Sequence, residues 1–297
     1  MIIRPGQPDG KRFYQLLTGT IAPRPIALAS TLDNEGKPNL SPFSFFNCFG
    51  SNPPTLVFSP LRRVRNNTTK HTLDNATESM EVVINVVSHA IVQQTSLASC
   101  EYGGGVNEFE KAGLTSLPSE IVKPFRVKES PVNFECKVTR IVETGQQGGA
   151  GNLIFCEVLL IHLKDEILDF DGFIDPHKID LVGRMGLNYY CRASGDAVFE
   201  VPKPNTELGI GFDSLPSSVR HSDILTGNDL GMLANVTERP LPDPAFYNRR
   251  VKSIQKDFSA DTLGMQTALQ RYAKELLEAN LVKEAWQVLL AGNNGNK

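Results

Sequence analysis

The sequence predicts a mainly β protein with peripheral helices, closed into a barrel, and three observations support this class. Five or six strand-like segments follow one another between residues 26 and 194. Clusters of turn residues separate these segments, and few helical segments lie between them. A doubly wound sheet would need a helix after nearly every strand, so the pattern favours a barrel.

The first part of this region contains four predicted strands, rich in the β-branched and aromatic residues that suit extended backbone. A turn cluster that ends in Gly36 separates the first two strands. Pro53 and Pro54 end the second strand. The four strands are residues 26–31, 39–49, 55–59 and 81–87.

The longest β signal is a predicted hairpin. Residues 132–144 alternate apolar and polar side chains, which places Val132, Phe134, Cys136 and Val138, with Ile141, on one face. A glycine-rich turn leads into residues 152–163, NLIFCEVLLIHL. We expect Cys136 and Cys156, one in each run, to be small buried apolar residues.

Helices are predicted at residues 69–79 and 88–99, with Ser88 as a possible N-cap of the second. The clearest helical signal begins at Asp261 and is amphipathic. Its apolar residues at helical spacing are Leu269, Tyr272, Ala273, Leu276, Leu277, Trp286, Leu289 and Leu290.

The chain is long enough for one large domain and an extension. Residues 202–258 contain many prolines and turn residues and separate the predicted barrel from the amphipathic helix. We therefore expect a barrel domain of residues 1–201. Residues 202–297 would form a C-terminal extension that ends in the helix and packs on the barrel.

Composition excludes several functional classes. The 297 residues carry a net charge of −3, which provides no general reason to bind nucleic acid. No apolar stretch approaches the ~20 residues of a membrane-spanning helix, and the start of the chain lacks the layout of a secretory signal. Five cysteines without a Cys-x-x-Cys pair argue against disulfides and zinc and suit the cytoplasm.

Catalytic and metal motifs are also missing from the sequence. Its five histidines include no His-Glu-x-x-His pattern, and no Gly-x-Ser-x-Gly marks a hydrolase nucleophile. Gly103, Gly104 and Gly105 precede no nucleotide-binding pattern and are better explained as a mobile loop. We therefore predict no metal site and assign no catalytic side chain.

A basic segment with several hydroxyl groups is the first candidate site. Residues 62–72, RRVRNNTTKHT, include Arg65, Lys70, His71 and Thr72. If a helix begins near Thr69, its free N–H groups and positive dipole end would join these cations in a phosphate site. A solvated basic loop is the simpler interpretation of composition alone.

The second candidate combines polar groups with flat apolar side chains. Its hydroxyl and amide groups are at Ser30, Thr31, Asn39, Ser41 and Ser44. Pro42, Phe43, Phe45 and Phe46 provide flat surfaces that could hold a polar-edged ring system. A core strand with a few satisfied hydroxyl groups is the alternative.

An ordered series of motifs over residues 12–195 resembles the flavin-reductase-like family of FMN-binding split β-barrels. The series begins with APRPIALASTLDNEGKPNLSPFSFFN at residues 22–47 and PPTLVFSP at 53–60. It continues with KHT at 70–72, EVVINVV at 81–87, NEFEKAGL at 107–114, SPVNFECKV at 130–138 and DLVGRMGLNYY at 180–190. This resemblance implies a six-stranded split barrel that works as a homodimer, with a C-terminal helical extension in this chain.

The resemblance also implies which residues hold the flavin at the dimer interface. The ring would contact Ala29, Ser30 and Thr31 and the stretch Ser41, Pro42, Phe43 and Ser44. The phosphate would be bound by Lys70 and Thr72, with Asn39 or Arg65. His71 stands where relatives usually have aspartate, which should make the phosphate site more positive.

What the resemblance implies about activity is hydride transfer from NAD(P)H through the FMN ring to flavin or another small acceptor. The cofactor would perform this chemistry, which agrees with the lack of an acid–base pair in the sequence. Two other functions remain open: an electron carrier that serves a protein partner, and a module that stores or senses flavin. Arg184 and Tyr189 could line the mouth of the site or have structural roles.

Overall fold

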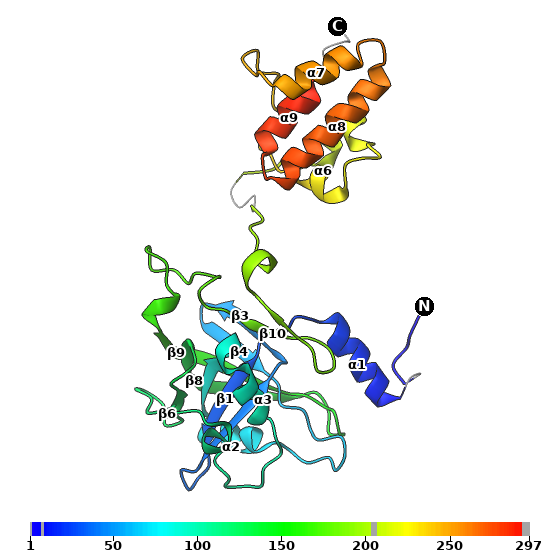
Figure 1. The fold of residues 1–297 in the computed structure, drawn as a ribbon. Coiled ribbons are helices and arrows are strands. Elements are labelled where there is room, and N and C mark those ends of the chain that lie inside the picture. Colours follow the sequence, from blue (N-terminus) through cyan, green and yellow to red (C-terminus); the bar gives the residue numbers. More distant parts are fainter. Residues whose placement is uncertain (1, 7–8, 203–206, 293–297) are drawn as a thin grey trace. The chain divides into compact units, whose positions relative to one another are not determined.

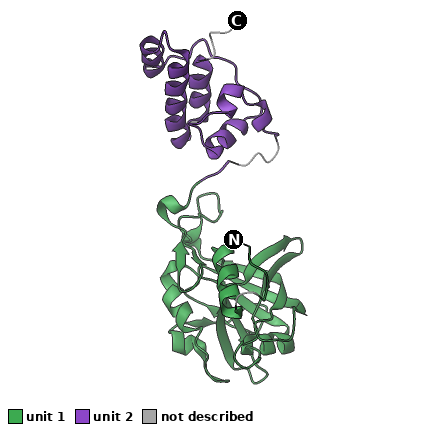
Figure 2. Cartoon of the chain, turned by 90° about the vertical axis from the view of Figure 1, so that its right-hand side faces the viewer, with its two compact units in different colours: residues 1–199 green, residues 200–297 purple. Residues whose placement is uncertain are grey.

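The computed structural model describes residues 2–6, 9–202 and 207–292, which belong to two compact units. Unit 1 comprises residues 1–199 and unit 2 comprises residues 200–297 (Figure 2). The predicted packing of residues 202–297 against the barrel stays a prediction.

The frame of unit 1 is a seven-stranded antiparallel sheet with strand order β2-β1-β5-β8-β9-β4-β3 (Figure 1). The strands are β1 (Ala27–Leu32), β2 (Pro38–Phe43), β3 (Phe46–Ser51), β4 (Pro54–Phe58), β5 (Glu81–Val86), β8 (Val132–Glu143) and β9 (Asn152–Leu163).

The two edge strands of this sheet are joined by only two residues. β2 ends at Phe43 and β3 begins at Phe46, so Ser44 and Phe45 connect opposite edges of the sheet. So short a link requires the edges to approach each other, which rolls the sheet into a barrel that stays split where no ladder joins β2 to β3. The predicted barrel is confirmed, but it has seven strands, because residues 39–49 form two strands rather than one.

Prolines in β2 agree with its place at the edge. Pro38 and Pro42 lack an N–H donor and would leave a gap in a ladder at the centre of a sheet. β1 lies between β2 and β5 and is buried on both faces. Ala27 and Ala29 pack in one apolar cluster, and Ile26 and Leu28 in another.

The predicted hairpin is confirmed as β8 and β9. Bulges at Glu135/Cys136 and Val138/Arg140 shift the register, so that Ile141 packs with Cys136 and Val138 despite its odd spacing. Cys136 and Cys156 are both fully buried, and burial raises the pKa of the Cys136 thiol to about 12. Both behave as the apolar core residues that we expected.

Short helices and strands surround the barrel. α2 (His71–Ser79) confirms the first predicted helix and packs against β1. The second predicted helix is a 3-10 turn, η1 (His89–Ile91), continued by α3 (Val92–Leu97). Ser88 precedes η1 but makes no side-chain capping bond. The remaining elements are α1 (Gly10–Thr20), α4 (Glu108–Ala112), β6 (Ser116–Leu117), β7 (Arg126–Val127), η2 (Asp165–Ile167), β10 (Val182–Arg184), β11 (Tyr190–Arg192) and η3 (Gly195–Ala197).

Unit 2 is helical and has its own apolar core. Trp286 is fully buried at its centre, where its indole N–H donates to the carbonyl of Leu233 at 3.1 Å. The segment rich in proline also forms helices that the sequence does not predict. The elements are η4 (Phe212–Ser214), α5 (Ser217–Arg220), α6 (Gly227–Ala234), α7 (Arg249–Asp257), α8 (Thr262–Glu278) and α9 (Val282–Ala291).

The prediction of a single amphipathic helix from Asp261 onward is wrong in one respect. The structure breaks it into α8 and α9, because Asn280 adopts a left-handed conformation with φ of 60°. Asparagine tolerates this conformation better than other residues with a side chain, and the chain reverses there.

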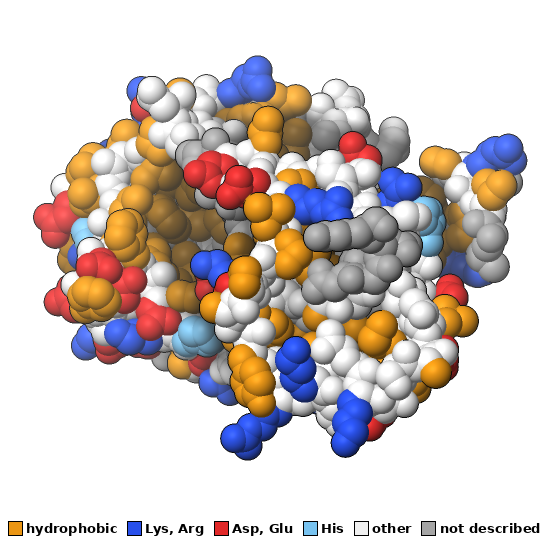
Figure 3. Space-filling view, turned by 90° about the horizontal axis from the view of Figure 1, so that it is seen from above, with side chains coloured by type: hydrophobic (Ala, Val, Ile, Leu, Met, Phe, Trp, Pro, Cys, Tyr) orange, Lys and Arg blue, Asp and Glu red, His pale blue; other side chains and the backbone are white. Residues whose placement is uncertain are grey.

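Basic and acidic side chains are interspersed over the face seen from above in Figure 3. Within the ranges that the structure describes, no helix is both long and apolar enough to cross a membrane.

Candidate functional site

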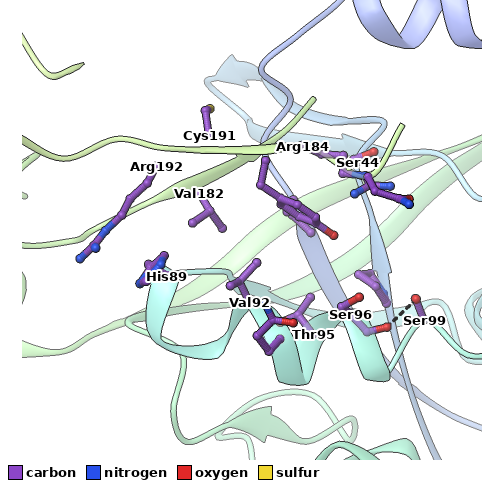
Figure 4. Close-up of a pocket in the computed structure, with 15 residues that line it drawn as sticks. Ser44, His89, Val92, Thr95, Ser96, Ser99, Val182, Arg184, Cys191 and Arg192 are labelled. Carbon is purple, nitrogen blue, oxygen red and sulfur yellow. Dashed lines mark hydrogen bonds between the residues drawn. The ribbon is translucent and has the colours of Figure 1, made fainter. Parts of the chain in front are cut away.

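A cavity of about 650 Å³ in unit 1 lies among three segments of the chain. The end of β2 contributes Pro42 and Ser44, and the η1–α3 segment contributes residues from His89 to Ser99. The β10–β11 hairpin forms the opposite side (Figure 4). Arg184 and Ser44 lie toward one end of the cavity, while His89 and Arg192 lie toward the other. We call this cavity the large pocket.

The side chains that line the large pocket give it a cationic character. They include Arg184, Arg192 and His89 but no aspartate or glutamate. Arg192 is engaged by Asp180 through bonds of 2.6 and 2.8 Å, and this pairing lowers the pKa of the Asp180 carboxyl. Arg184 lies over the ring of Tyr190 at 4.6 Å, donates to the carbonyl of Leu187 and forms no ion pair among the described residues. Arg184 is therefore the cation best able to receive an anionic ligand.

A second cavity of about 200 Å³ adjoins the large pocket, because the two share Pro42, Ser44 and Ser99. We call it the small groove. The structure brings five of the predicted site residues together here. They are Ser41, Pro42, Phe43, Ser44 and Lys70.

Each cavity has a buried hydroxyl group that finds no hydrogen-bond partner among the residues the structure describes. Ser59 lines the small groove and Thr95 lines the large pocket; they are 7% and 3% exposed. A buried polar atom without a partner is costly unless a ligand or water satisfies it. These two groups therefore fit a bound molecule with polar edges.

Arg24, which the sequence analysis did not single out, holds the segments around these cavities in place. Its buried guanidinium donates to the carbonyls of Thr18, Ile21 and Met185 and contacts the hydroxyl of Ser44 at 3.4 Å. Desolvation lowers the pKa of Arg24. Its position between two prolines in APRP is the only sequence signal that sets it apart.

The predicted residues Ala29, Ser30 and Thr31 lie elsewhere, fully buried in β1. Asn75 donates to the hydroxyl of Thr31 at 3.1 Å, and the hydroxyl of Ser30 has no partner within the described part of the chain. Their side chains line neither cavity. They border the site through the backbone, since Ala29 pairs with Ser41 on β2.

Asn39 and Thr72 form a buried chain of hydrogen bonds with Glu108. The hydroxyl of Thr72 donates to Asn39 Oδ1 at 2.7 Å, and Asn39 Nδ2 donates to Glu108 at 3.0 Å. Desolvation raises the pKa of Glu108, although its hydrogen bonds oppose this. Asn39, Glu108 and His71 line a separate pocket of about 100 Å³. None of Asn39, His71 and Thr72 lines the small groove.

Three cations converge next to the N-terminus of α2. Arg63, Arg65 and Lys70 all contact the carboxylate of Glu101, at 3.1, 2.6 and 3.5 Å. We call these three residues the cation cluster; it contains both Arg65 and Lys70 from the prediction. Sequence reasoning missed Glu101, because nothing in the glycine-rich loop indicates where its first residue points. Across the described residues, no group of three or more potential ligands could hold a metal ion.

Comparison with known proteins places this arrangement in a family. Residues 19–176 match the model of the flavin reductase like domain. A protein of Aquifex aeolicus, itself uncharacterised, is 39% identical over 65% of this chain and 96% of its own length. The chain belongs to the flavin reductase-like family, whose split β-barrel it shares.

Two solved structures show the same fold at moderate identity. Nitrilotriacetate monooxygenase component B from Bacillus cereus is 28% identical, with a TM-score of 0.63 over 68% of this chain and 98% of its own. The 2-nitrobenzoate 2-nitroreductase of Pseudomonas fluorescens is 27% identical, with a TM-score of 0.61 over 73% and 99%. The family model ends at residue 176 and does not extend into unit 2.

Proposed function

We propose that this protein binds FMN and transfers hydride from NAD(P)H to flavin or another small acceptor. The observation that carries this proposal is the juxtaposition of the small groove, the large pocket and the cation cluster. Together these three neighbouring features provide flat apolar surface, unsatisfied hydroxyl groups and concentrated positive charge. A flavin mononucleotide combines a flat polar-edged ring with a dianionic phosphate and matches this chemistry.

In this proposal, Pro42 and Phe43 provide the flat contacts for the ring. Ser41, Ser44 and Ser59 face its polar edge. Lys70 binds the phosphate together with the first N–H groups of α2, which lack acceptors within the helix. Ala29, Ser30 and Thr31 support this arrangement from β1, and Asn39 and Thr72 fix the start of α2 through Glu108.

The large pocket would take the nicotinamide dinucleotide. Arg184 is suited to its diphosphate, and the shared residues Pro42, Ser44 and Ser99 connect this pocket to the small groove. The bound flavin would supply the two-electron chemistry. The protein's own residues bind both partners, hold their rings face to face and exclude water.

We also propose a homodimer, supported by exposed apolar side chains. Leu159, Ile161 and Leu163 alternate along one face of β9, each at least 41% exposed. Phe170 and Phe173 follow and are 97% and 72% exposed. Exposed apolar side chains of this density are typical of a protein interface, and a second copy of the chain would cover them. Sedimentation should show a dimer that Ile161→Lys converts to monomer.

The proposed activity is tested by two measurements on the purified protein. Titration with FMN should give saturable binding with a perturbed visible spectrum, and NADH or NADPH oxidation should accelerate when FMN is added. A protein that binds FMN but oxidises neither nucleotide would instead be an electron carrier or a flavin-storing module. One that binds no flavin would contradict all three functions.

A further inference from the structure

Glu101 occupies the centre of the cation cluster. Its two carboxylate oxygens divide between the cations: Oε1 contacts Arg63 and Lys70, and Oε2 contacts Arg65. Desolvation alone would raise the pKa of Glu101, but Lys70, Arg63 and Arg65 outweigh it and lower that pKa. A carboxylate thus binds where a flavin phosphate would find the same three cations.

Part of the cluster is held in place by groups other than Glu101. Arg63 also donates to the hydroxyl of Thr68 at 3.0 Å and to the carbonyl of Thr69, so the loop before α2 holds it in place. Lys70 directly precedes α2 and is only partly exposed. The guanidinium of Arg63 is therefore held by its own segment, and the backbone of Lys70 by its place before α2, so we expect both cations to stay near the site if the carboxylate leaves.

The loop that carries Glu101 is rich in glycine. Gly103, Gly104 and Gly105 follow it, and Gly105 has a φ of 78°, which suits glycine. Nothing would contact an added Cβ at Gly103 within 4 Å. Beyond the glycines, Asn107 caps α4 and anchors the far end of the loop. We therefore expect that Glu101 can leave the cluster while α3 and α4 stay folded.

We propose that Glu101 is a specificity-determining residue, an internal anion that competes with the phosphate of FMN for Arg63, Arg65 and Lys70. This inference rests on the proposed function. FMN must displace Glu101 before its phosphate can bind, whereas riboflavin, which has no phosphate, need not. The glutamate therefore reduces the preference of the protein for the phosphorylated flavin. Its return to the cluster would also favour release of FMN.

The ratio of the dissociation constants for riboflavin and FMN measures this competition. Both flavins are titrated into the full-length wild-type protein, Glu101→Gln and Glu78→Gln, at one ionic strength, with quenching of flavin fluorescence as the readout. Glu78 is an exposed carboxylate on α2 without a contact to the cluster, so it controls for the change in net charge. Glu101→Gln should bind FMN about five- to tenfold more tightly, because no internal carboxylate then occupies the three cations that the phosphate needs. Its affinity for riboflavin should be unchanged. Glu78→Gln should match the wild type.

Two results would overturn the inference while leaving the proposed function intact. One is weaker binding of FMN to Glu101→Gln, which would make Glu101 part of the binding site. The other is an equal change in the affinities for both flavins, which would indicate a general effect on the loop. If none of the three folded proteins bound either flavin, the proposed function would fall together with this inference.

Discussion

At the scale of single residues, Glu135 is a charged side chain that the fold buries completely. Its carboxylate accepts hydrogen bonds from the backbone N–H groups of Glu120, Ile121 and Val122 at 2.8, 2.7 and 3.2 Å. His162 lies 2.7 Å away. Burial alone would raise the pKa of Glu135, but these hydrogen bonds outweigh it and lower the pKa. The carboxylate therefore ties the 120–122 loop to β8.

This pKa shift predicts a pH-dependent contribution to stability. Because the folded pKa is lowered, the stabilisation is fully present above the unfolded value of about 4.3 and is lost as pH falls through the folded value. Glu135→Gln should lower the free energy of unfolding by about 1.5–3 kcal/mol at pH 7. Denaturant titrations followed by circular dichroism should show this difference shrinking below about pH 4. A difference independent of pH would contradict the assignment.

Lys70 is the residue on which the proposed phosphate site depends most. Lys70→Ala removes a charge-assisted contact worth about 1.5–3 kcal/mol, so FMN should bind roughly ten- to a hundredfold more weakly. Calorimetric titration would measure this loss, with Lys137→Ala on β8 as an exposed control. Unchanged affinity for FMN would place the phosphate elsewhere.

At the scale of elements, local sequence signals predicted where strands form better than where a predicted strand or helix is interrupted. The β8–β9 hairpin follows directly from the alternation of apolar and polar residues, and the helix predicted at residues 69–79 is present as α2. The break at Ser44–Phe45 was missed, because both flanking strands are aromatic and the break depends on closure of the barrel. The break between α8 and α9 was missed because helical spacing of leucines continues on both sides of it.

The turn at Asn280 provides a test of this second break. Alanine in the left-handed conformation costs about 1 kcal/mol or more, whereas glycine adopts it freely. We therefore expect Asn280→Ala to lower the free energy of unfolding of unit 2 by about 1 kcal/mol and Asn280→Gly to retain it. Urea denaturation monitored by the fluorescence of Trp286 would measure both. Equal stability of the two variants would show that the turn relaxes.

At the scale of the whole molecule, the chain contains one tryptophan, and it reports on unit 2 alone. Trp286 is buried among residues of α6, α8 and α9. The proposed flavin site lies entirely within unit 1. The two signals can therefore follow the two units separately in the intact protein.

We expect the two units to unfold in separate transitions, since each has its own apolar clusters. In urea, the change in Trp286 fluorescence and the release of FMN should have different midpoints. Added FMN should raise the midpoint of FMN release and leave that of Trp286 fluorescence unchanged. Coincident midpoints that shift together with FMN concentration would instead mean that the units unfold as one.

The sequence by itself determined the class of fold, the β8–β9 hairpin, helix α2 and the family. These depend on local periodicity and on the order of motifs along the chain. The family resemblance joined Lys70 and the Ser41–Ser44 stretch as predicted flavin contacts; all five residues line the small groove, and flavin binding by them stays a prediction. Only the tertiary structure decided that β1 is buried on both faces, that Arg24 and Glu135 are buried charges, and that Glu101 meets the cation cluster. The physical reason is that burial and charge pairing arise between segments far apart in the chain, and neither composition nor spacing within one segment contains that information.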